Sequence, residues 1–206
     1  MSEKIIEIPA IKLGRMTVSI EGRTPLLTNR FGEKTMEAIE AKQQKKAKTA
    51  KEARNPEQEF QDACHMIGKG TYGFPAGGLK KALVVAGGRF ADEKMTHLRG
   101  VLNPEGDLIP IIGPAPTMRK DSVRLQGGIT SIAYRPQFMP WAMDVPIVYN
   151  ASLIGEAQIL NLFQIAGFAV GIGAWRPESN GVFGQFTLKE SVAVVEKPKR
   201  RLQAAE

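Results

Sequence analysis

The clearest pattern along the chain is an alternation of hydrophobic and polar residues over positions 15–22. Met16, Val18 and Ile20 are each followed by a polar residue. Because side chains two positions apart share one face of a strand, this period predicts a half-buried β-strand. Thr24 and Pro25 follow the strand, and they are expected to end it.

Three later segments have the period of an amphipathic helix instead. The first covers residues 75–87, and its apolar face consists of Leu79, Ala82, Leu83 and Ala86. The second covers residues 155–168 and has a wider apolar face. A shorter helix is expected over residues 56–66, with Asn55 as its N-terminal cap.

Strand-like patterns occupy residues 130–138 and 142–149, and the short segment between them predicts a hairpin. A last strand is expected over residues 183–195, and a candidate strand over 108–112. In chain order the main elements are strand, helix, two strands, helix and strand. This order predicts an α+β fold of the ferredoxin-like type, β-α-β-β-α-β.

Two long segments interrupt this order, so we expect one domain over residues 1–195 with insertions at about 30–70 and 92–128. Between Lys42 and Lys51 there is no acidic and no large apolar residue, which favours an exposed or disordered insertion. A solvated charged helix is the alternative. Residues 3–13 are expected to form a short leading strand, and residues 196–206 a mobile basic tail.

The balance of charges narrows the class of partner. The 206 residues carry a net charge of +7, and the pI is about 9.6. An excess of positive charge favours an anionic partner, above all nucleic acid. Cys64 is the single cysteine, so no internal disulfide is possible. This composition, with no signal peptide or membrane-spanning run expected, predicts a cytoplasmic protein without a membrane partner.

Few residues in the sequence are suited to catalysis. His65, His97 and Cys64 do not have the spacing of a metal site, and no phosphate-binding loop motif of the GxxxxGK type occurs. Cys64 and His65 are adjacent, and adjacent helical residues point about 100° apart, which is poor geometry for a nucleophile and its base. The sequence therefore predicts no enzyme, no metal and no cofactor.

The most distinctive stretch is the glycine-rich loop, residues 167–186, which lies between the second helix and the last strand. It contains five glycines and carries Trp175 and Arg176 near its middle. Glycines let backbone approach a ligand closely and leave amides free, while arginine and tryptophan suit the phosphates and bases of a single strand. The alternative interpretation is a long turn with Trp175 packed in the core against the preceding helix.

The segment VGIGAWRPESNGVFGQF within this loop resembles the signature loop of the RAMP superfamily, ferredoxin-like RNA-binding proteins of CRISPR effector complexes. The segments FPAGGLKKAL and IEGRTPLLTN are similar to that family's first-helix start and opening strand. The backbone subunit of those complexes is the most similar subtype, because it too has a long insertion after its first strand. The aspartate of RNA-cleaving members has no counterpart here in a matching context. The sequence also resembles uncharacterised bacteriophage proteins.

These observations lead us to expect non-catalytic binding of single-stranded RNA or DNA, largely independent of sequence. The resemblance implies a homo-oligomer or filament along the strand. The alternatives are an RNA-processing endonuclease of the same fold, with His65 or His97 as general base, and a phage structural or accessory protein. The expected binding residues are Lys42, Lys45, Lys46, Lys80, Lys81, Arg119, Lys120, Arg124, Gly171, Gly173, Trp175 and Arg176.

Overall fold

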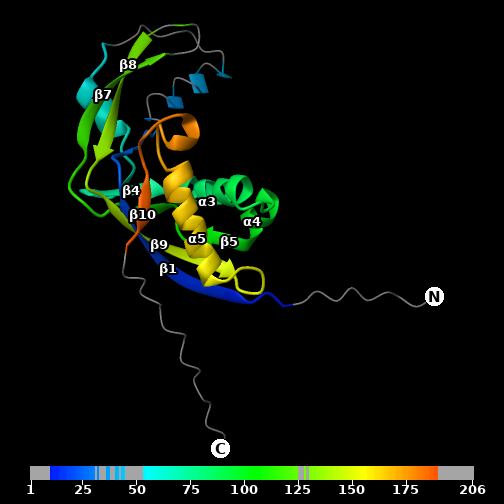
Figure 1. The fold of residues 1–206 in the computed structure, drawn as a ribbon. Coiled ribbons are helices and arrows are strands. Elements are labelled where there is room, and N and C mark those ends of the chain that lie inside the picture. Colours follow the sequence, from blue (N-terminus) through cyan, green and yellow to red (C-terminus); the bar gives the residue numbers. More distant parts are fainter. Residues whose placement is uncertain are drawn as a thin grey trace, which may run out of the picture.

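Three antiparallel sheets and the helices packed around them form a mixed α+β fold (Figure 1). The structure is a computed structural model, and it describes residues 10–30, 32, 36–37, 40–41, 43–44, 53–124, 128 and 130–189. Lys42, Lys45 and Lys46, most of the leading strand expected over 3–13, and the expected tail lie outside the described residues.

The largest sheet has four strands in the order β10-β1-β9-β5. The central pair is β1 (Leu13–Gly22) and β9 (Ala142–Asn150), which are paired from Leu13 with Asn150 to Glu21 with Ala142. The edge strands are β10 (Phe186–Leu188) and β5 (Leu102–Pro104). Strand β1 buries Met16, Val18 and Ile20, as the alternation predicts.

Two helices pack against this sheet and against each other to form the core. Helix α3 (Ala76–Phe90) buries the apolar face predicted for residues 75–87. Helix α5 (Glu156–Ile165) buries Ile159 and Phe163, and a π-helical turn (Ala166–Val170) continues it into the glycine-rich loop. Figure 1 shows both helices on the same side of β1 and β9.

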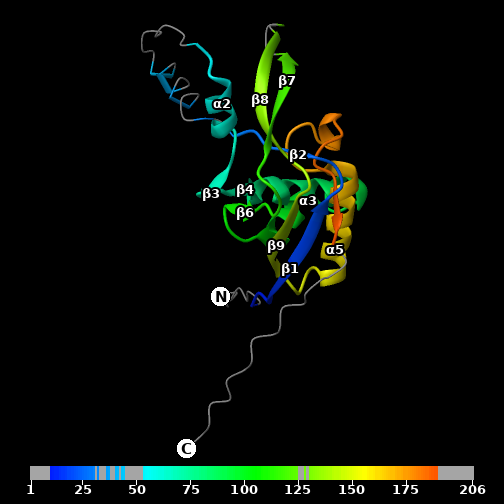
Figure 2. The same ribbon diagram turned by 90° about the vertical axis from the view of Figure 1, so that its left-hand side faces the viewer.

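In a second sheet, ordered β2-β8-β7, strands β7 and β8 form a hairpin that projects away from this core (Figure 2). It consists of β2 (Leu26–Leu27), β7 (Thr117–Arg124) and β8 (Thr130–Phe138). The prediction that residues 130–138 pair with 142–149 is wrong. Strand β8 pairs with β7 and β2, whereas β9 pairs with β1 and β5.

The physical reason for this change of partner lies between the two strands. Trp141 is buried, and its indole Nε1–H donates a hydrogen bond of 2.8 Å to the carbonyl of Thr24. Its ring packs edge-on against Phe186. The chain is therefore anchored in the core at Trp141, and β9 continues into the four-stranded sheet instead of folding back on β8.

Further elements occupy the segments expected to be insertions. Helix α2 (Pro56–Asp62) begins after Asn55, whose side chain accepts a hydrogen bond from the amide of Gln58, as predicted. Residues 92–128, expected to be an insertion, contain α4 (Met95–Val101), β5, β6 (Leu108–Pro110) and β7. Strands β3 (Met66–Gly68), β4 (Thr71–Pro75) and β6 form the third sheet. Among the described helices, none is long and apolar enough to span a membrane.

The anchoring role of Trp141 can be tested by Trp141→Phe. This change keeps an aromatic ring but leaves the Thr24 carbonyl without its donor, which should cost about 1–3 kcal/mol in the free energy of unfolding, measured with urea. Trp175→Phe is the matched control, because Trp175 is more exposed and should cost much less. Equal losses at the two positions would contradict the anchoring role.

Candidate nucleic-acid interface

The glycines of the loop mainly allow its own backbone segments to pack closely against each other, and not a ligand to approach. A Cβ at Gly184 would lie 1.7 Å from the Ile172 carbonyl oxygen, and one at Gly181 would lie 1.7 Å from that of Trp175. Gly173 similarly approaches the carbonyl of Leu27. Only glycine can occupy such positions, so the loop is folded tightly upon itself.

The amide of Gly171 was expected to face a phosphate, and the structure corrects this prediction. It donates a hydrogen bond of 2.7 Å to the carbonyl of Ala166, and Gly171 is buried. Neighbouring amides are also used within the protein, because Ile172 donates to Gly184 and Ala174 donates to Leu27. The loop therefore presents its side chains, and not these amides, to a ligand.

Trp175 is displaced outward by the packing of the loop. Its φ of 53° is in the left-handed region, its carbonyl accepts a hydrogen bond from the Phe183 amide, and its side chain is not in the core. The interpretation that it packs against the preceding helix is thus wrong. The Phe183 ring stacks on the indole, and the residue remains 38% exposed.

The hairpin supplies two guanidinium groups to these aromatic rings. Arg135 lies over the Trp175 ring at 5.2 Å, and Arg119 lies over the Phe183 ring at 4.8 Å. Both distances are within the range of cation–π attraction. Arg119 and Arg135 are directly opposite each other on β7 and β8, so the register of the hairpin places them together.

A buried carboxylate holds the two arginines. Asp121 is 6% exposed, with Oδ1 at 2.8 Å from Arg119 Nε and Oδ2 at 3.8 Å from Arg135 Nη1. We call Asp121, Arg119, Arg135, Trp175 and Phe183 the arginine–aromatic network. It ties the hairpin to the glycine-rich loop and carries one positive charge in excess. Arg135 and Asp121 were not predicted, and only the β7–β8 register brings them to this site.

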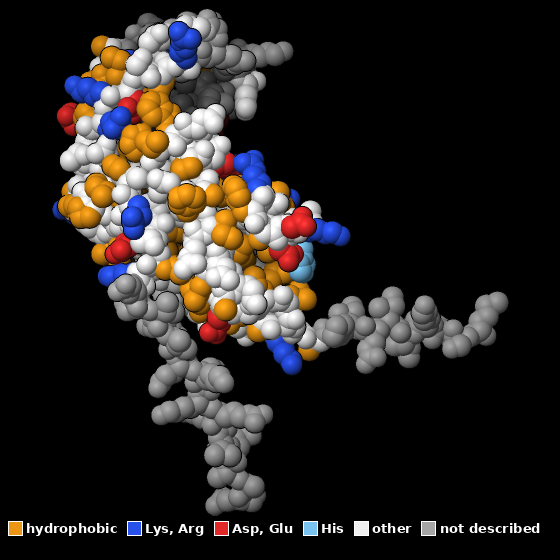
Figure 3. Space-filling model, in the orientation of Figure 1, with side chains coloured by type: hydrophobic (Ala, Val, Ile, Leu, Met, Phe, Trp, Pro, Cys, Tyr) orange, Lys and Arg blue, Asp and Glu red, His pale blue; other side chains and the backbone are white. Residues whose placement is uncertain are grey.

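Two further predicted residues of the hairpin lie on the opposite face of β7 from Arg119 and Asp121, because side chains alternate along a strand. Lys120 and Arg124 are exposed on β7, and Lys120 lies 6.0 Å from the Tyr134 ring opposite it. Figure 3 shows basic side chains among hydrophobic ones in the region where Figure 1 places β7 and β8. Such a mixture suits a strand that offers both phosphates and ring faces.

The other predicted basic residues have different surroundings. Arg176 donates to Glu178 Oε2 at 2.6 Å and to the Gly173 carbonyl at 3.1 Å, so its guanidinium braces the loop internally. Lys80 donates to Asn103 of β5, at the opposite end of the four-stranded sheet from β10. Lys81 follows it on α3 and is exposed. The structure does not bring Lys80 and Lys81 to the arginine–aromatic network, and Arg176, although it follows Trp175, is paired with Glu178.

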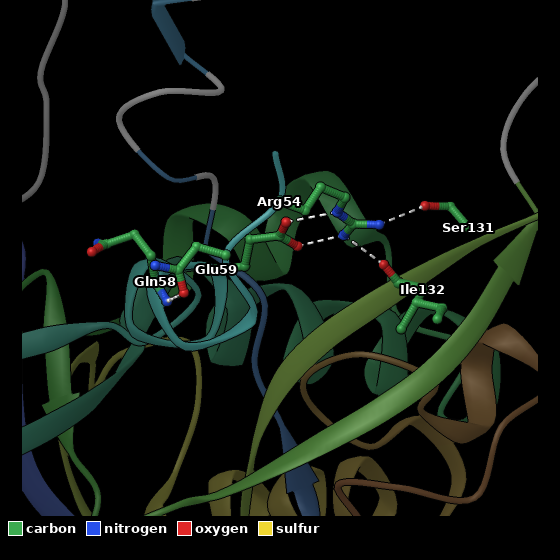
Figure 4. A network of polar contacts seen from close by, with 6 residues as sticks. Arg54, Gln58, Glu59, Ser131 and Ile132 are labelled. Carbon is green, nitrogen blue, oxygen red and sulfur yellow. Dashed lines mark hydrogen bonds and ion pairs between the residues drawn. The ribbon is translucent and has the colours of Figure 1, made fainter. Parts of the chain in front are cut away.

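A groove of about 550 Å³ separates α2 from the hairpin, and Arg54 crosses it. Arg54 donates to both carboxylate oxygens of Glu59, to Ser131 Oγ at 3.2 Å and to the Ile132 carbonyl at 2.7 Å (Figure 4). The hydrogen bonds that Arg54 donates to the Glu59 carboxylate raise the pKa of its guanidinium above its ordinary value. Arg54 therefore fixes the position of α2 beside β8.

Comparisons with known proteins support the fold. No family model matches the chain, and no curated protein matches its sequence. The chain is similar in structure to one from the cryo-EM structure of the Type III-B Cmr-beta bound to cognate target RNA, with a TM-score of 0.53 and 13% identity. The match covers 90% of this chain and 61% of that one, so this chain spans less than two thirds of its neighbour's length. At this identity the likeness concerns the fold alone.

The tight packing of the loop predicts that Gly184→Ala is strongly destabilising. Gly184 has a φ of +67°, and the added Cβ would overlap the Ile172 carbonyl. Left-handed strain and overpacking together should cost about 3 kcal/mol or more, measured by chemical denaturation.

Gly70→Ala is the matched control for this prediction. Gly70 has a similar φ of +74°, but an added Cβ there would meet no atom within 4 Å. It should therefore show the conformational cost alone, about 1 kcal/mol. A similar loss at both glycines would mean that close packing does not determine the shape of the loop.

Proposed function

We propose that this chain binds single-stranded nucleic acid, without cleaving it, on the surface formed by the β7–β8 hairpin and the glycine-rich loop. The observation that carries the proposal is the arginine–aromatic network. It presents a partly exposed indole beside guanidinium groups that are held in place by a buried carboxylate. Bases stack on such rings, and phosphates bind nearby cations.

The network favours a single strand over a duplex. An aromatic ring can stack on a base only when that base has left its own stack, which is the normal state of single strands and loops. Lys120 and Arg124 are exposed on the other face of the same hairpin, where they would bind phosphates of a strand that continues around it. Since every base has a ring face and every nucleotide a phosphate, recognition here is largely independent of sequence.

The fold adds support for RNA as the strand to test first. The sheet order β10-β1-β9-β5, with α3 between β1 and β5 in the chain and α5 between β9 and β10, supports a ferredoxin-like core. In this assignment β5, and not β8, is the second strand. We propose that the chain is RAMP-like on this basis and on the resemblance of the glycine-rich loop. The structural neighbour comes from an RNA-bound complex.

Cleavage of RNA is a second candidate function, and one observation favours it. His65 lines a hollow beside Gly173, and burial and the nearby Arg30 lower the pKa of its imidazole. A neutral imidazole is the form in which histidine acts as a general base. Incubation of end-labelled RNA with the protein and with His65→Ala tests this function. Product bands that require His65 would favour the endonuclease over the binding protein.

Assembly of copies along the strand also remains a proposal, because the lysine-rich segment that would link them lies largely outside the described residues. Deletion of residues 34–52, which leaves Arg54 and its contacts to α2 and β8 in place, should weaken cooperative binding more than it weakens folding, as measured by the steepness of binding curves beside thermal melting. Unchanged cooperativity would count against this segment as the link.

Binding should depend on salt through the cations of the hairpin. For a labelled RNA strand, log affinity should fall linearly with log salt, with a slope of about −0.7 for each phosphate neutralised. The double variant Lys120→Ala, Arg124→Ala should make the slope shallower by about 1.4. Lys80→Ala with Lys81→Ala, away from the network, is the matched control and should change it little. A larger change in slope for the Lys80 and Lys81 variant than for the Lys120 and Arg124 variant would indicate that the strand binds at α3.

Trp175→Ala separates stacking from folding. Loss of one stacked base should weaken binding by about 1–3 kcal/mol in fluorescence anisotropy titrations. The same variant should keep most of its stability, whereas Phe163→Ala, in the core, should lose about 3–5 kcal/mol. A Trp175→Ala protein that binds normally would show that the indole is not the stacking platform.

A further inference from the structure

A small hollow beside the glycine-rich loop is not explained by the arginine–aromatic network. It has a volume of about 260 Å³ and lies where the end of β2 meets His65, the β4–α3 junction and the loop. Its lining consists of Thr28, Asn29, His65, Phe74, Pro75 and Gly173–Ala174. Ala174 directly precedes Trp175, so the hollow and the indole belong to the same loop.

Thr28 is the unusual member of this lining. The residue is 2% exposed, and its amide donates a hydrogen bond of 3.3 Å to the carbonyl of Pro136. Its hydroxyl, however, has no hydrogen-bond partner among the described residues. Buried polar groups are almost always paired, and an unpaired one lowers stability. A valine would fill the same space without that cost, so the hydroxyl indicates a bound group that supplies the partner.

The chemistry of the hollow defines that group. Thr28, Asn29 and a neutral His65 can each both donate and accept a hydrogen bond, and the lining has no charged side chain. Phe74, Pro75 and Ala174 add apolar surface. A phosphate would need cations or several free amides here. A flat heterocycle with alternating donors and acceptors on its edge fits this lining better.

We propose that the hollow is a subsite for one nucleobase of the bound strand, turned out of the stack and read by hydrogen bonds to its edge. This inference rests on the proposed function and adds one base-selective position to a footprint that is otherwise independent of sequence. Turning a base outward requires it to leave its stack, which is least costly in a single strand. The walls and the hydrogen-bonding residues of the hollow replace the contacts that the base has lost.

The test uses the full chain with fluorescein-labelled oligo(A), oligo(C) and oligo(U) of equal length, and an abasic strand of that length. The protein should prefer one of the three bases by about tenfold, the effect of about one good hydrogen bond. Thr28→Val should remove this preference and leave affinity for the abasic strand unchanged. It should also raise the melting temperature, because the unpaired hydroxyl is gone.

Two further variants make the result specific to the hollow. Thr71→Val, at an exposed position at the start of β4 and outside the lining, is the matched control and should change neither preference nor melting temperature. Ala174→Leu fills the hollow from the loop side and should also abolish the preference without touching Thr28. Together these variants distinguish a filled subsite from a general effect of changing threonine.

The remaining outcomes would overturn the inference. Equal affinity for all three bases, or a preference that survives both Thr28→Val and Ala174→Leu, would leave the proposed function intact but remove the subsite. A fall in the melting temperature of Thr28→Val would show that the hydroxyl has a partner in the free protein. Failure to bind any strand, the abasic one included, would remove the proposed function and this subsite with it.

Discussion

The candidate interface depends on how the glycine-rich loop docks on the two-residue strand β2. The amide of Ala174 donates to the Leu27 carbonyl and the amide of Gly184 to the Pro25 carbonyl, both at 2.8 Å. The opposite side of β2 pairs with β8, so one short strand holds both the loop and the hairpin. Trp175 and Arg135, which are 40 positions apart in the sequence, meet because of this shared support.

Once loop and hairpin are adjacent, the buried carboxylate of Asp121 determines how the cations lie. Burying an unpaired carboxylate is costly, and two guanidinium groups offset that cost only while they stay close. The same two groups lie over the rings of Trp175 and Phe183. The carboxylate thus holds the platform in shape before a ligand arrives, which reduces the ordering that binding would otherwise require. Because there are two arginines to one aspartate, the platform remains positive.

The sequence predicts those elements whose apolar residues repeat with the regular spacing of a strand or a helix. Strand β1 and helices α3 and α5 follow from the spacing of their apolar residues. The pairing of β8 does not, because strands that are adjacent in the sequence usually form a hairpin, and only the buried Trp141 separates β8 from β9. Strand β7 reads as a polar segment, and its one buried side chain is Asp121. Trp175 could be singled out from composition, but Arg135 and Asp121 become site residues only through the register of β7 and β8.

The glycines also explain why the proposed binding would rest on side chains. Glycine density is compatible with a loop whose amides cradle an anion, as in phosphate-binding loops. Here the missing Cβ atoms instead let carbonyls approach at Gly173, Gly181 and Gly184, and the amides of Gly171, Ile172 and Ala174 are used internally. These three amides are therefore not free for a phosphate. On the proposed function, the outward indole and the cations of the hairpin would supply much of the affinity through stacking and charge.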